Sequence, residues 1–233
     1  MGNVANYVAP FSPGFLAKGL FLKIDKGLNL TEYTSAVASN AFLLLSVTSL
    51  SGAVIVLINP FMDKFWYLFS SSFIVFALST LFFLKGSEIL KFLSISYFHN
   101  IAKKASTGLD LISADSRNLV FVIITLLLQI IVSSLLMFQL FWSIGQPIEM
   151  NAALLIAIFT ILSNFFSVTP GNIGIQEVVM GFLSTLYGSD FGHGLLVGSV
   201  LRAAHIFITF TIGSFFIFSI LKNANLEFKN LID

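Results

Sequence analysis

Long apolar runs, separated by short polar segments, form the main pattern along this chain. Four of them contain no Asp, Glu, Lys or Arg: Tyr33–Met62, Phe65–Leu84, Asn118–Ile148 and Met150–Gln176. A fifth apolar run, Leu195–Leu221, contains Arg202 and His205. A membrane-spanning helix needs about 20 predominantly apolar residues. The pattern therefore predicts spans over residues 34–58, 66–84, 119–144 and 195–221, and a broken helical hairpin over 152–168 and 175–187.

Composition supports the same class of protein. Hydrophobic residues make up 57% of the chain and charged residues 10%, with a mean hydropathy of +0.95, whereas a soluble domain carries about 25% charged residues. We predict an all-α fold, a polytopic transmembrane helix bundle that forms one integral membrane domain over residues 1–233. The net charge of +1 indicates no nucleic-acid partner. With no cysteine, the chain has no thiolate metal site and no Cys nucleophile.

The distribution of Lys and Arg predicts the orientation, because these residues accumulate in cytoplasmic loops. They gather in residues 18–32, in the loop 85–117 and in the C-terminal tail. We place these three segments on the cytoplasmic side of the plasma membrane. The segments 59–65, 145–151 and 188–194 then lie outside. Within the cytoplasmic loop, "SEILKFLSISYFHNIAKK" is either an interfacial helix on anionic headgroups or a plain connector.

This topology requires the chain between 151 and 188 to enter the membrane and return. At 1.5 Å per residue, 152–168 would span about 25 Å and 175–187 about 20 Å, and both are shorter than the hydrocarbon core of about 30 Å. The intervening "TPGNIG" would turn within the membrane or near its inner face. We interpret the segment as a discontinuous, re-entrant hairpin. A plain cytosolic turn is the alternative, because Pro-Gly marks turns in all proteins.

The residues of the turn suit a break in a helix. Pro170 stops the incoming helix, and Gly171 and Gly174 can adopt positive φ. A new helix starts at Ile175, where its free N–H groups favour an anion. Backbone N–H and C=O groups that lose their helical partners inside the membrane must be buried in protein or line a water-filled cavity.

Glu177 follows the break closely, and Arg202 and His205 lie within the next apolar run. Because charge inside a bilayer is costly, we predict that Glu177 and Arg202 face one polar cavity, either paired or jointly contacting a charged headgroup. His205 lies three residues beyond Arg202, on the same helical face. The alternatives are Glu177 at an interface, Arg202 snorkelling from near the outer end of its helix, and His205 as a packed polar residue.

The N-terminal segment 7–24 repeats this pattern. Pro13 and Gly14 break it, and an apolar half-helix that carries Lys18 follows. Two Pro/Gly-broken segments in corresponding positions point to a site between structural repeats. We therefore predict that Lys18 and Glu177 approach the same cavity.

"PGNIGIQE" followed by "LLVGSVLRAAHIFITFTIG" resembles the C-terminal signature of the lysylphosphatidylglycerol synthase transmembrane-region family, the flippase-like proteins. Gly174, Glu177 and Arg202 fall on the positions of that signature. The segment from Ala9 to Phe42 resembles the family's earlier block, with Lys18 where Arg is usual and Ser39-Asn40 where a Glu-Arg pair is usual. Members usually have about two more helices before this block, so a wrongly placed start, a fragment and a reduced member all remain open.

The resemblance implies a membrane domain that binds and moves lipids or lipid-linked intermediates between leaflets. In the namesake synthases a separate soluble domain transfers the aminoacyl group, so we expect a non-enzyme here, without cofactor or metal. The alternative is a non-transporting membrane subunit that anchors or regulates a lipid- or glycan-modifying enzyme. The predicted substrate-binding residues are Glu177, Arg202, Lys18, Pro170, Gly171, Gly174, Pro13, Gly14 and His205. Neither the lipid nor the oligomeric state follows from the sequence.

Overall fold

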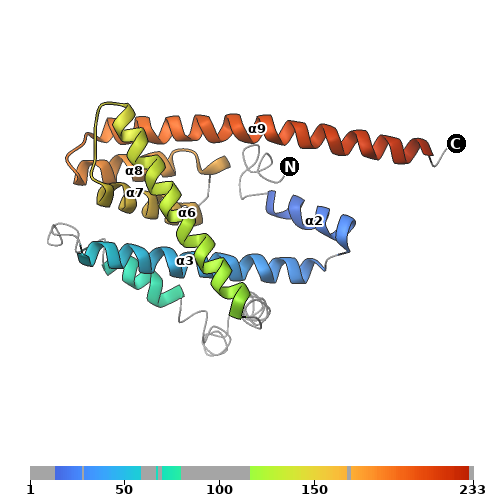
Figure 1. Ribbon diagram of the computed structural model, residues 1–233, viewed down its shortest axis with the longest axis horizontal. Coiled ribbons are helices and arrows are strands. Elements are labelled where there is room, and N and C mark those ends of the chain that lie inside the picture. Colours follow the sequence, from blue (N-terminus) through green and yellow to red (C-terminus); the bar gives the residue numbers. More distant parts are fainter. Residues whose placement is uncertain are drawn as a thin grey trace.

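In a computed structural model, the described part of the chain consists of helices joined by short turns (Figure 1). It comprises residues 14–27, 29–58, 67, 70–79, 116–166 and 169–230, and these residues contain no strand. The predicted all-α fold is therefore confirmed for this part of the chain. Pro13, most of the predicted loop 85–117 and parts of the predicted span 66–84 lie outside the described residues.

In the described part of the chain, three helices are long and apolar enough to cross a membrane. They are α3 (Leu30–Ile58), α6 (Ser116–Ser143) and α9 (Phe191–Asn230), with candidate spans Glu32–Ile58, Arg117–Ser143 and Phe191–Phe215. A span of 27 residues is about 40 Å long at 1.5 Å per residue, which exceeds the hydrocarbon core of about 30 Å. These helices coincide with the predicted spans 34–58, 119–144 and 195–221, although α9 begins four residues earlier and continues to Asn230.

The outward faces of the long helices are apolar. On α6, Phe121, Ile124 and Leu128 are each more than half exposed, and Phe207 and Phe215 on α9 are 72% exposed. Water would penalise such a surface, because soluble monomers rarely expose large contiguous apolar patches. Lipid chains cover it at no such cost. The chain is therefore an integral membrane protein.

Two short helices, α7 (Met150–Ser163) and α8 (Ile175–Leu186), form a hairpin beside α9 (Figure 1). Helix α7 lies at the centre of the fold and contacts α3, α6 and α8. Its small and branched side chains pack against residues from each neighbouring helix, and the main core cluster consists of Val56, Met137, Phe141, Ile148, Ala152, Ala153, Leu155, Ile156, Ala157, Met180, Leu183 and Val197. The hairpin is thus held on several sides by packed helices.

Serine side chains join α3 to the helix Ser70–Ser79, which lies within the predicted span 66–84. The hydroxyls of Ser46 and Ser79 are 3.0 Å apart and share a hydrogen bond. Gly52 allows close approach, because a Cβ there would lie 3.2 Å from Ser72 Oγ. Small residues and interhelical hydrogen bonds are typical of helix contacts in membranes.

The N-terminal helix α2 (Gly14–Lys26) packs on α3. The hydroxyl of Tyr33 donates to the carbonyl of Phe15 at 3.2 Å, and the two rings lie 5.1 Å apart. A Cβ on Gly19 would lie 2.9 Å from two carbons of the Tyr33 ring, so glycine permits this close contact. This packing fixes α2 on the N-terminal end of α3.

Candidate functional site

The connection between α7 and α8 contains three residues with left-handed backbone. The φ angle is 58° at Gly171, 60° at Asn172 and 88° at Gly174. Glycine adopts positive φ without steric cost, and asparagine tolerates it better than most residues. The positive φ expected for Gly171 and Gly174 is confirmed, and the new helix begins at Ile175 as predicted.

The incoming helix ends earlier than the sequence pattern predicted. Helix α7 stops at Ser163 rather than continuing to 168, and Pro170 opens a separate short 3₁₀ turn, Pro170–Asn172. A 3₁₀ turn, Asn164–Phe166, follows α7 directly, and residues 167 and 168 lie outside the described residues. The backbone N–H of Asn164 bonds to the carbonyls of Ile161 and Leu162, and Asn172 Nδ2 donates to the carbonyl of Ser163 at 3.3 Å. These bonds satisfy carbonyls that a helix end leaves free.

Glu177 occupies the start of α8. Its Oε2 accepts a hydrogen bond from the backbone N–H of Gly174 at 2.9 Å, as the acidic residue of a capping box does. A carboxylate in the first turn also interacts favourably with the positive end of the helix dipole. The anion expected at this helix end is thus supplied by the protein itself.

Arg202 on α9 binds both Glu177 and the backbone of the turn between α7 and α8. Its Nε donates to Glu177 Oε1 and its Nη2 to Glu177 Oε2 at 3.0 Å. Its Nη1 donates to the carbonyl of Gly171 at 2.6 Å, and Nη2 donates to that of Asn172 at 2.9 Å. One guanidinium therefore neutralises the carboxylate and satisfies two carbonyls that the left-handed turn frees. This meets the requirement for backbone satisfaction inside a membrane.

The ion pair lies deep in the fold. Only 10% of the Arg202 side chain and 11% of the Glu177 side chain are exposed. Helix α9 starts at Phe191, so Arg202 lies about 16 Å along it at 1.5 Å per residue, near the middle of the candidate span Phe191–Phe215. The guanidinium turns inward to the hairpin, and the snorkelling alternative does not describe it.

Glycines allow α9 to approach α8 closely enough for this contact. A Cβ on Gly194 would lie 2.5 Å from the carbonyl oxygen of Met180, and one on Gly198 would lie 3.1 Å from the Cα of Glu177. Both distances are too short for an unshifted side chain. Backbone contact of this kind is common between membrane helices with small residues at the interface.

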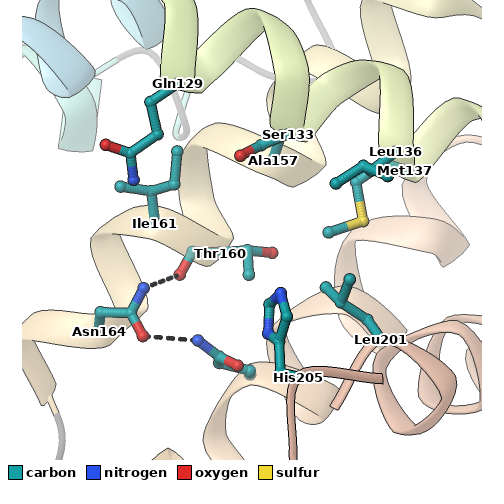
Figure 2. A pocket seen from close by; sticks show the side chains of 11 residues that line it. Gln129, Ser133, Leu136, Met137, Ala157, Thr160, Ile161, Asn164, Leu201 and His205 are labelled. Atoms are coloured by element: carbon teal, nitrogen blue, oxygen red, sulfur yellow. Dashed lines mark hydrogen bonds between the residues drawn. The ribbon is translucent and has the colours of Figure 1, made fainter. Parts of the chain in front are cut away.

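A cavity of about 140 Å³ lies next to the ion pair, because its lining includes Gln176 and Leu201, the chain neighbours of Glu177 and Arg202. Residues from α6, α7, α8 and α9 and the turn after α7 line it: Gln129, Ser133, Leu136, Met137, Ala157, Thr160, Ile161, Asn164, Gln176, Leu201 and His205. Figure 2 shows Gln129, Asn164 and His205 approaching the same space from different helices. Neither Glu177 nor Arg202 belongs to this lining, so the two charges are paired beside the cavity rather than facing into it.

Amide side chains connect the cavity to the turn between α7 and α8 that Arg202 binds. Gln176 Nε2 donates to Asn164 Oδ1 at 2.5 Å, and Asn164 Nδ2 donates to the carbonyl of Thr160 at 3.4 Å. The Arg202 guanidinium lies 3.4 Å from Gln176 Oε1. Thr160 itself is 7% exposed, and its hydroxyl has no hydrogen-bond partner among the described residues. The Thr160 hydroxyl can therefore form a hydrogen bond to a ligand in the cavity.

The residues predicted for the site separate into two groups. The structure brings Glu177, Arg202 and the glycines of the turn together, and it places His205 in the cavity lining. Lys18 is exposed on α2 and Gly14 is the first residue of that helix. Neither lines the cavity, so the structure does not bring residues 14–24, the described part of the N-terminal segment, to the predicted common site.

The sequence reasoning missed the uncharged polar residues of the lining. They are Gln129, Ser133, Thr160, Asn164 and Gln176. The available signal was a polar side chain near the middle of an apolar run, as at Gln129 in Asn118–Ile148. Among the described residues, no cluster of three His, Asp or Glu could hold a metal ion.

Comparison with known proteins identifies the family. A family model described as the lysylphosphatidylglycerol synthase TM region matches residues 1–213. No curated protein and no solved structure matches the chain. The match covers most of the 233 residues, including the break, Glu177 and Arg202. The chain belongs to the lysylphosphatidylglycerol synthase TM region family.

Proposed function

We propose that this protein moves a lipid or lipid-linked intermediate between the leaflets of a membrane. The observation that carries the proposal is a polar cavity at the middle depth of otherwise apolar helices. Gln129 lies near the centre of the span Arg117–Ser143, and His205 lies near the centre of Phe191–Phe215. Polar groups there are costly unless they face a cavity or a partner.

The short helices of the broken hairpin explain why space for a cavity exists. Helices of 14 and 12 residues are about 21 Å and 18 Å long at 1.5 Å per residue, and neither crosses a core of about 30 Å. We propose that the hairpin enters the membrane and returns to the same side. The space that a full-length helix would fill is then available to a headgroup, as at the half-helix sites of transporters.

The mechanism requires binding and no covalent chemistry. In this proposal the headgroup enters the cavity past the exposed side chains of Gln129 and His205, while the acyl chains remain against the apolar outer face of α6. The Glu177–Arg202 pair holds the turn between α7 and α8 against α9, so the headgroup meets a preformed polar surface. Movement is passive or coupled to a gradient.

We propose a plasma-membrane location. The proposed orientation, with the segment 145–151 outside, follows from the distribution of Lys and Arg. The turn between α7 and α8 then lies toward the cytoplasmic half of the bilayer.

Leaflet exchange in vesicles tests the proposal. The full chain is reconstituted into liposomes that contain lipids with a fluorescent acyl chain, and an impermeant reductant quenches the probe in the outer leaflet. We expect the quenched fraction to rise beyond one half, at a rate proportional to the protein content. If exchange with the protein equals that of empty liposomes, and the chain co-purifies with a stoichiometric enzyme, the anchoring alternative replaces this proposal.

A further inference from the structure

We infer that the cavity binds an uncharged, hydroxyl-rich lipid headgroup, about one sugar ring in size, in preference to a charged one. The inference rests on the proposed function and specifies its substrate class. It depends on the chemistry of the lining, on the partners of the neighbouring charges, on the unused hydroxyl of Thr160 and on the cavity volume.

The lining carries hydrogen-bonding side chains and no carboxylate, ammonium or guanidinium group. Three amides, two hydroxyls and one imidazole supply its polar groups, and none of the residues that line the cavity is Asp, Glu, Lys or Arg. Amides and hydroxyls offer both donors and acceptors. A sugar or glycerol hydroxyl is also both donor and acceptor, so the two surfaces are complementary.

The nearest charges are already neutralised. The Arg202 Nε, Nη1 and Nη2 all donate within the protein, and both oxygens of Glu177 accept. A charged headgroup in this cavity would therefore meet no carboxylate, ammonium or guanidinium counter-ion among the described residues that line it. An ion without such a partner is strongly disfavoured in an apolar environment. The charged headgroup expected from the sequence does not fit this lining.

Thr160 provides an independent sign of a ligand. Its side chain lies at the cavity, is more than nine-tenths buried, and leaves its hydroxyl without a partner in the described structure (Figure 2). A buried polar group without a hydrogen bond is costly, and a ligand hydroxyl would remove that cost.

The volume matches one ring. A cavity of about 150 Å³ in another protein binds benzene, and the cavity here measures about 140 Å³. The apolar part of the lining, which includes Leu136, Met137 and Leu201, can contact the C–H faces of such a ring. A single sugar residue or a glycerol unit therefore suits both the size and the chemistry.

Cysteine protection tests the inference without depending on transport. The chain has no cysteine, so Ser133→Cys places one thiol in the cavity lining. Ser143→Cys, at the exposed end of α6, is the matched control. Each variant is reconstituted in vesicles that contain a glucosyl diacylglycerol, phosphatidic acid or a diacyl trimethylammonium lipid, and the rate of reaction with N-ethylmaleimide is measured.

We expect the glucosyl lipid to slow labelling of the cavity cysteine at least fivefold, with no change at the control position. Adding Thr160→Val should reduce this protection by about fivefold, which corresponds to the loss of one net hydrogen bond. Thr125→Val, on the exposed face of α6, should leave it unchanged. Equal protection by either charged lipid, or none by the glucosyl lipid, would overturn the inference. Protection without leaflet exchange would support the binding specificity and refute transport.

Discussion

Arg202 and Glu177 are 25 residues apart and form a two-point ion pair between α9 and the first turn of α8. The same guanidinium binds the carbonyls of Gly171 and Asn172. The pair therefore stabilises three things together: the start of α8, the left-handed turn before it and the contact with α9. Its position beside the cavity, rather than in its lining, assigns it a positioning role.

Removing the guanidinium should destabilise the fold strongly. We expect Arg202→Leu to lower the free energy of unfolding by about 3–5 kcal/mol, because it leaves a buried carboxylate unpaired and frees two carbonyls. Chemical unfolding in detergent measures the change. The double variant Arg202→Leu, Glu177→Met should recover part of the loss, because no charge then lacks a partner. Lys23→Leu, at an exposed position of α2, should change stability by about 0.5 kcal/mol or less. Equal effects of Arg202→Leu and Lys23→Leu would contradict the assigned role.

Two glycines at the start of α9 offer a matched test of the packing between α8 and α9. A Cβ on Gly194 would lie 2.5 Å from Met180 O, whereas nothing lies within 4 Å of one on Gly192. We expect Gly194→Ala to cost about 1–3 kcal/mol through overpacking. Gly192→Ala should be neutral or stabilising by up to about 1 kcal/mol, because alanine has the higher helix propensity. Thermal unfolding of both variants measures the difference, and similar melting temperatures would refute the close approach.

The long helices could be predicted from the sequence because a bilayer requires continuous apolar length. The charge-free run Asn118–Ile148 gave the span 119–144, close to α6. The end of α7 could not be predicted. It depends on Asn172, nine residues away, whose amide donates to the Ser163 carbonyl. Such a tertiary cap leaves no periodic pattern in the sequence. Pro170 is a strong local indicator of a helix end, but in the structure it begins the 3₁₀ turn Pro170–Asn172.

The candidate site was predictable in the same limited way. A carboxylate and a guanidinium inside apolar runs are costly, so charge predicted that Glu177 and Arg202 come together, either paired or jointly contacting a charged headgroup. The amides and hydroxyls of the cavity are cheaper to bury and occur throughout membrane helices. Only their three-dimensional arrangement separates Gln129, which lines the cavity, from Gln139, which does not. The convergence expected for Lys18 rested on a matched pattern that carried no spatial information.

Asn172 tests the backbone of the turn. It combines a positive φ of 60° with an amide that donates to the carbonyl of Ser163. Both Asn172→Gly and Asn172→Ala remove the side-chain amide and its hydrogen bonds, but only alanine keeps a Cβ in the left-handed region, without a polar group to offset its strain. We expect the alanine variant to be less stable than the glycine variant by about 1 kcal/mol, the lower end of the left-handed penalty. Equilibrium unfolding of the two variants gives this difference directly, and an alanine variant as stable as the glycine variant would exclude the left-handed turn.

Two glutamines on α6 test whether the cavity carries transport. Gln129 and Gln139 are both exposed, but only Gln129 lines the cavity. We expect Gln129→Leu to slow leaflet exchange about tenfold, because the leucine removes an amide worth about 1 kcal/mol per hydrogen bond to the headgroup. Gln139→Leu changes the same side chain on the same helix away from the cavity and should exchange lipid at the original rate. Equal slowing by both variants would indicate a general effect of altering α6, and normal exchange by Gln129→Leu would remove the cavity from the transport path. Because leucine suits a membrane helix at least as well as glutamine, neither variant should unfold, and a measured rate difference reports on the headgroup alone.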